Sequence, residues 1–208
     1  MPVRQIVMSS TVCRSTRQKL HLALGWVGKA EECRAARPRL ALLLLRLAER
    51  VMASAGTSSP AVLRTRGQVL AGMDRPAAAL RALQEALLLD PLDLATRTLR
   101  DQAVTSARSH LLGPARPVGD RELAELYHAL LAADCAGVDV HLAVASRWAE
   151  RGELTGARDL VTAVLTLHPT RREAWELLGR IARDQGDLPL ARHAESEAAA
   201  GTAPPRTG

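Results

Sequence analysis

Along most of the chain, apolar residues recur three or four positions apart, with polar and charged residues between them. Residues 38–54 show this pattern most clearly, because their leucines would share one face of a helix. Pro38 suits the first turn of that helix, where a backbone N–H has no partner. The same spacing predicts helices over 94–111 and from Asp120 to about 133, on either side of a loop rich in glycine and proline.

The hydrophobic residues themselves favour helices over strands. Leucine, alanine and valine dominate, phenylalanine is absent from the sequence, and aromatic residues make up 2% of it. Strands are usually rich in β-branched and aromatic residues, so this composition argues against a sheet. Hydrophobic residues make up 47% of the 208 positions, which is enough for a packed domain. We therefore predict an all-α protein.

Three segments of the chain share a frame of 34 residues. Residues 138–171 and 172–205 align without a gap, and residues 60–93 fit the same frame. Its recurring small residues and prolines are Gly67, Ala145 and Gly179, then Ala79, Ala157 and Ala191, then Pro91 and Pro169. In the last unit, Trp175, Leu178 and Gly179 form the start of a known motif. The pattern resembles the tetratricopeptide repeat family, and this resemblance implies an α-solenoid of antiparallel helix pairs.

The local chemistry of the units agrees with that resemblance. Small residues at matching positions let two helix axes approach closely. Gly152 and Gly186 suit the left-handed conformation that ends a first helix, and Asp187 can cap the helix that follows. Glu195 stands where the family has an aromatic residue that packs on a next repeat. We therefore expect the unit beginning at residue 172 to be the terminal one.

These patterns divide the chain into four parts. The parts are a basic extension over 1–37, expected to be disordered, an N-terminal helix and linker over 38–59, a solenoid over 60–202, and a disordered tail over 203–208. The solenoid consists of units 60–93, 94–137, 138–171 and 172–202. Unit 94–137 is ten residues longer than the frame. It is either a divergent repeat with an enlarged loop between its helices or a helical insert outside the repeat series.

Positive charge is concentrated at the N-terminus. Residues 1–59 carry ten basic and three acidic residues, whereas residues 60–208 carry 18 basic and 19 acidic residues. The balanced charge of the repeats argues against nucleic-acid binding by them. The basic segment leaves one alternative open, a regulatory module that contacts the transcription apparatus or nucleic acid through its N-terminus.

The predicted location is cytoplasmic. Three cysteines, an odd number at no recurring spacing, fit a reducing compartment, and no apolar window is long enough to span a membrane. Three interpretations of the N-terminus stay open. Its arginine- and serine-rich, acid-free start fits a mitochondrial presequence, and Ser10-Thr11-Val12-Cys13 faintly resembles a lipoprotein cleavage site. The third interpretation is a disordered arm or a misassigned start.

Candidate catalytic and metal-binding residues do not form a known pattern. Gly25-Trp26-Val27-Gly28-Lys29 lacks the first glycine and the final hydroxyl of a phosphate-binding loop. His128, Cys135 and His141 are seven and six residues apart, whereas zinc ligands usually come in closer pairs. We expect no enzyme activity, no cofactor and no metal, although an accessory domain of an enzyme remains an alternative.

The resemblance implies a protein–protein interaction scaffold or adaptor that binds a peptide or a helix on its concave face. Carried over to this sequence, the groove-facing positions of the family include Arg64, Gln68, Leu142, Ser146, Glu173, Glu176, Arg180 and Arg183. Some of these charges are expected to form pairs within one helix. The excess of Arg64, Arg180 and Arg183 predicts an acidic or carboxylate-bearing partner. The sequence leaves the identity of the partner and the oligomeric state open.

Overall fold

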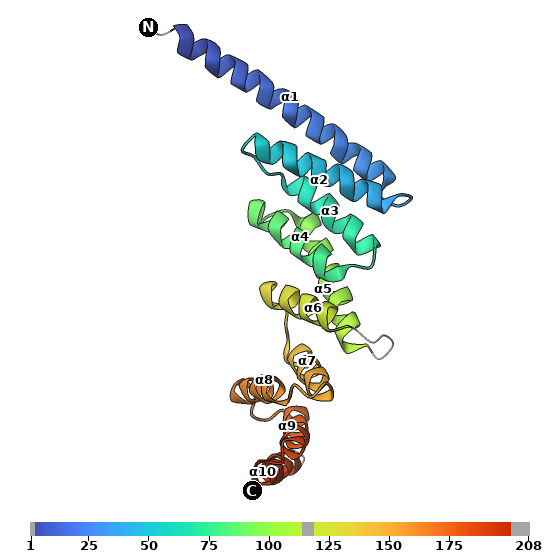
Figure 1. Ribbon diagram of the computed structural model, residues 1–208, viewed down its shortest axis with the longest axis vertical. Coiled ribbons are helices and arrows are strands. Elements are labelled where there is room, and N and C mark those ends of the chain that lie inside the picture. The colour runs from blue at the N-terminus through green and yellow to red at the C-terminus, as the bar shows by residue number, and fades with distance from the viewer. Residues whose placement is uncertain (1–2, 114–118, 201–208) are drawn as a thin grey trace. The chain divides into compact units, whose positions relative to one another are not determined.

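The computed structural model describes residues 3–113 and 119–200, and for residues 3–15 it describes the backbone alone (Figure 1). These residues form ten helices and no strand, which confirms the prediction of an all-α fold. The helices are α1 (Val3–Cys33), α2 (Pro38–Ser54), α3 (Pro60–Gly72), α4 (Pro76–Leu89), α5 (Leu94–Leu112), α6 (Asp120–Ala132), α7 (Val138–Glu150), α8 (Leu154–Leu167), α9 (Arg172–Asp184) and α10 (Leu188–Ala200). The expected tail over 203–208 lies outside the described residues.

The chain forms two compact units, residues 1–107 and 108–208, and α5 crosses the boundary between them. In the first unit α1 packs against α2 and α3 against α4, and α2 also contacts α3. In the second unit α7 packs against α8 and α9 against α10, and α8 also contacts α9. Each unit is therefore built as a solenoid is, from antiparallel helix pairs that stack on their neighbours in the sequence.

The helix pairs fall within the 34-residue frame. Helices α3 and α4 lie within residues 60–93, α7 and α8 within 138–171, and α9 and α10 within 172–202. In each of these pairs a turn of three residues joins the two helices. The segment over 94–137 contains α5 and α6, and the middle of the loop between them, residues 114–118, lies outside the described part.

The N-terminal segment differs from the expectation of disorder, because α1 is a helix of 31 residues. Its Ala23, Val27 and Ala30 are buried and spaced four and three positions apart, so they form a narrow apolar stripe where α1 packs on α2. Leu22 and Leu24 beside this stripe are exposed. Because these leucines are apolar but exposed, the sequence does not show which apolar residues form the buried face of the helix. The packing on α2 identifies that face.

The small residues of the frame are buried where the helices of a pair meet, as predicted. Ala79, Ala145 and Ala157 have no exposed surface, and Ala191 is 2% exposed. Gly67 faces Leu83 on α4, and a Cβ atom placed on Gly67 would lie 2.5 Å from the Cγ atom of Leu83. These positions therefore set how closely each pair of helices can approach.

The turns between paired helices also follow the sequence prediction. Gly152 and Gly186 adopt φ angles of 82° and 79°, the left-handed region that glycine enters without steric cost. Asp74, at the same position of the frame in unit 60–93, adopts φ 56°. The backbone N–H of Leu190 donates to the Asp187 carboxylate at 3.2 Å, which caps the start of α10.

Candidate partner-binding groove

Helix α9 presents a charged face because its other face is buried. Leu177, Leu178 and Ile181 belong to the core that α9 shares with α7, α8 and α10. Arg172, Glu173, Glu176, Arg180 and Arg183 are exposed. Since residues three, four and seven positions apart share one side of a helix, burial of the apolar side directs these charged residues to the surface.

The charged face of α9 and the neighbouring part of α10 line an open cavity of about 650 Å³, which we call the α9–α10 groove. Its charged lining residues are Arg172, Glu173, Glu176, Arg180, Arg183 and Glu195. Ala198 and Ala199 on α10 complete the lining with small side chains. The structure thus brings together three predicted binding residues, Glu176, Arg180 and Arg183, with Glu173, and adds Glu195 from the next helix.

Four of the six charged residues that line the groove form two ion pairs. The Nε atom of Arg172 donates to Oε1 of Glu176 at 2.6 Å. The guanidinium of Arg183 donates to Glu195, with Nε to Oε1 at 2.9 Å. All four side chains are about half exposed, so each pair contributes little to stability.

The two remaining charged residues that line the groove are Glu173 and Arg180, which belong to neither ion pair. Neither side chain has an ion pair or a hydrogen bond within residues 16–113 and 119–200, whose side chains the structure describes. The three arginines and three glutamates of the groove therefore balance in number. They leave one unpaired carboxylate and one unpaired guanidinium available to a partner.

The predicted excess of free arginine is wrong for two of its three members. Arg64 Nη1 lies 2.7 Å from Oδ2 of Asp93, and Arg183 is paired with Glu195. Neither partner belongs to the same helix as its arginine, so spacing along one helix could not reveal the pairs. The charge pattern consequently does not favour an acidic partner.

The other predicted binding residues make contacts of their own. In the first unit, Gln68 accepts a hydrogen bond from Arg34 at 2.6 Å. In the second unit, Ser146 donates to Glu150 at 3.3 Å, and Leu142 is partly buried against the core. Arg64 and Gln68 belong to the first unit and the remaining candidates to the second, so the two groups form separate candidate surfaces.

Asp93 is a structural residue that the sequence analysis missed. Its carboxylate accepts hydrogen bonds from the backbone N–H groups of Ala95 and Thr96, from the Thr96 hydroxyl at 2.6 Å, and from Arg64. It therefore caps the start of α5. The hydrogen bond from the Thr96 side chain contributes most to lowering the pKa of Asp93, burial opposes this effect, and Arg64 lowers the pKa further. An aspartate directly before a predicted helix start was the available signal.

Replacing Asp93 with asparagine should make the stability of the protein less sensitive to acid. Because the folded-state pKa lies below the ordinary value of 3.8, the ionised Asp93 stabilises the fold above that pH. This contribution disappears as the pH falls through the lowered pKa. Urea midpoints measured at pH 6 and pH 3 should therefore differ less for Asp93→Asn than for the native chain.

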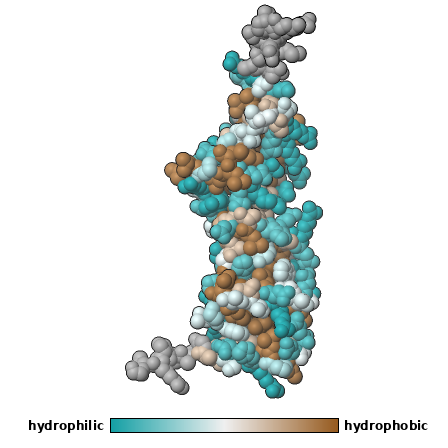
Figure 2. Space-filling view, turned by 90° about the vertical axis from the view of Figure 1, so that its left-hand side faces the viewer, coloured by the Kyte–Doolittle hydropathy of each residue, from teal (hydrophilic) through white to brown (hydrophobic). Residues whose placement is uncertain are grey.

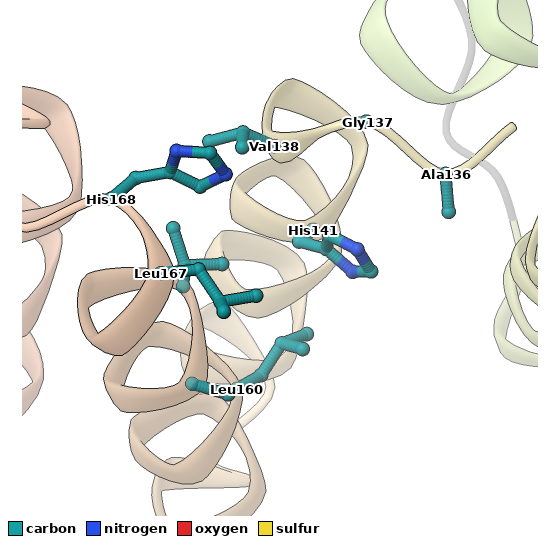
Figure 3. Close-up of a pocket in the computed structure, with 9 residues that line it drawn as sticks. Ala136, Gly137, Val138, His141, Leu160, Leu167 and His168 are labelled. Carbon is teal, nitrogen blue, oxygen red and sulfur yellow. The ribbon is translucent and has the colours of Figure 1, made fainter.

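A second cavity, of about 420 Å³, lies beside α7 and α8 and is mainly apolar (Figure 3). Val138 and His141 of α7 line it together with Leu160 and Leu167 of α8, and with His168. Leu167 is 76% exposed. Hydrophobic surface is also visible among hydrophilic surface on the face of the molecule drawn in Figure 2.

Two of the three residues considered as metal ligands, His141 and Cys135, make hydrogen bonds of their own. Nδ1 of His141 lies 2.8 Å from the hydroxyl of Tyr127, and the thiol of Cys135 donates to the Ala133 carbonyl at 3.2 Å. Tyr127 also packs edge-to-face on Trp148, with ring centroids 6.2 Å apart, and burial raises its pKa. Among the residues whose side chains are described, no group of three or more His, Cys, Asp or Glu residues could hold a metal ion.

The comparisons with known proteins yield similar structures at low sequence identity. No protein-family model matches the chain, and no curated protein matches its sequence. Among solved structures, MamA (41-end) from Desulfovibrio magneticus RS-1 is 16% identical, with 86% of this chain and 93% of that chain covered and a TM-score of 0.37. MamA of AMB-1 is 14% identical, with 86% and 90% covered and a TM-score of 0.40.

The tetratricopeptide type of the fold rests on the chain itself. Its paired helices lie in the 34-residue frame, small residues are buried where the paired helices meet, and glycines in the left-handed conformation end the first helices of two units. No described helix is both long enough and apolar enough to cross a bilayer.

Proposed function

We propose that the chain is a protein-binding module of the tetratricopeptide repeat family, and that the α9–α10 groove receives a segment of a partner protein. The observation that carries this proposal is the pair of unpaired charges, Glu173 and Arg180, in an open groove next to small residues. Side chains of opposite charge held on one rigid helix favour a partner of complementary charge and set its register. Units 60–93, 94–137, 138–171 and 172–202 are the proposed repeats.

The chemistry of the groove suits recognition of another polypeptide. An arginine guanidinium can bind a carboxylate through two parallel hydrogen bonds, which fixes the orientation of the partner. Ala198 and Ala199 leave room for the partner's backbone to approach α10. Glu176 and Glu195 pair with Arg172 and Arg183 on either side, so Glu173 and Arg180 are the charges that meet the partner.

A photoreactive amino acid in place of Ala199 tests this proposal. On irradiation in a cell extract, the full chain should form a covalent adduct with a protein. Adding Arg180→Glu should reduce the yield of that adduct about tenfold, which corresponds to about 1.4 kcal/mol. Arg192→Glu, an exposed residue of α10 that does not line the groove, is the matched control and should leave the yield unchanged. Equal yields with Arg180→Glu and Arg192→Glu would exclude the groove as the binding site.

A further inference from the structure

The two unpaired charges of the α9–α10 groove are seven residues apart on one helix. Seven residues correspond to almost two helical turns, so Glu173 and Arg180 lie on the same side of α9, about 10.5 Å apart along its axis. The carboxylate is nearer the N-terminal end of the helix and the guanidinium nearer its C-terminal end. A partner must therefore present a cation and an anion with the same separation and in the reverse order.

Helix α9 itself has that arrangement when it runs in the opposite direction. In an isologous contact about a two-fold axis, residue i of one copy meets residue j of the other, and residue j meets residue i. With the axis between residues 176 and 177, Glu173 of each copy faces Arg180 of the other. This geometry forms two ion pairs and satisfies both charges of each copy, whereas a parallel contact in register would place like charges together.

The neighbouring charges are compatible with such a contact. Glu176 lies nearest the proposed axis, and its own Arg172 neutralises it at 2.6 Å. Arg183 is held by Glu195. Equal numbers of arginine and glutamate line the groove, so two copies of it have no net repulsion, and the alanines of α10 leave space beside α9.

We propose that the occupant of the α9–α10 groove is a second copy of this chain, bound with its α9 antiparallel so that Glu173 of each copy pairs with Arg180 of the other. The proposal rests on the proposed function, because it names the partner of the same groove. Since the charges are exposed, association should be reversible and should weaken as salt screens the pairs.

Exchange of charge between two variants tests the proposal directly. Glu173→Arg alone places arginines opposite each other twice, and Arg180→Glu alone does the same with glutamates. Each variant by itself should dimerise at least about tenfold more weakly than the native chain in sedimentation equilibrium. An equimolar mixture should restore association, because every contact between the two different variants is again between opposite charges.

The double variant Glu173→Arg with Arg180→Glu should also dimerise as the native chain does, because it only exchanges the two ends of each pair. Arg192→Glu is the charge-matched control and should leave association unchanged. Helical circular dichroism of each variant checks that these exposed substitutions leave the fold intact. A native chain that stays monomeric at high concentration and low salt, or variants that do not recover on mixing, would overturn the proposal.

The photo-crosslinking experiment separates this inference from the proposed function. A monomeric chain that still forms an Arg180-dependent adduct with a different protein would contradict self-association while supporting the groove as a binding site. A self-adduct with the mass of two chains, lost in Arg180→Glu and recovered by mixing that variant with Glu173→Arg, would support both.

Discussion

Replacing Ile181 with alanine should lower the free energy of unfolding by about 2–5 kcal/mol. Ile181 has no exposed surface and lies in the core formed by α7, α8, α9 and α10. The substitution removes buried apolar surface and leaves a cavity that the surrounding helices fill only in part. Urea unfolding followed by circular dichroism measures the change.

Leu188→Ala provides the control for this prediction. Leu188 begins α10 in the same unit, but its side chain is 57% exposed, so the substitution should change stability by less than about 0.5 kcal/mol. Similar urea midpoints for Ile181→Ala and Leu188→Ala would contradict the described core. They would also contradict the argument that burial of the apolar side of α9 directs its charged side to the surface.

Replacing Gly67 with alanine should destabilise the protein by about 1–2 kcal/mol, even though alanine is the better helix former. The added Cβ atom would lie 2.5 Å from Cγ and 2.7 Å from Cδ2 of Leu83. Leu83 is 1% exposed, so its buried side chain must shift before the added Cβ atom can fit. The cost of overpacking should therefore exceed the gain in helix propensity.

Gly179→Ala is the matched substitution, because Gly179 occupies the same position of the frame in the last unit. There the nearest atom to an added Cβ atom would be the Cβ atom of Ala194, at 3.6 Å, which is an ordinary van der Waals distance. Its gain in helix propensity should stabilise the protein by about 0.5–1 kcal/mol. Shifts of the same sign in the urea midpoints of Gly67→Ala and Gly179→Ala would contradict the packing described for the two pairs.

The sequence predicted the positions of most helices because the determining interactions are local. Pro38 begins α2 as predicted, and Gly152 and Gly186 have the expected left-handed conformation at the ends of α7 and α9. The period of 34 residues likewise identified the small residues that are buried between paired helices. Turn geometry and the hydrophobic period of a helix depend on residues a few positions apart. Both can therefore be predicted from the sequence alone.

Tertiary structure decided which charged side chains are paired and whether the N-terminal segment is helical. Arg64 meets Asp93, which caps the start of α5, and Arg183 meets Glu195 on α10, so both pairs form between elements whose relative placement depends on packing. Long arginine side chains can reach several carboxylates, and only the packed helices determine which one lies near. In the same way, α1 shows its short apolar stripe only where α2 covers it. The unpaired state of Glu173 and Arg180 likewise followed from these contacts, because their availability to a partner depends on which neighbouring charges are already bound.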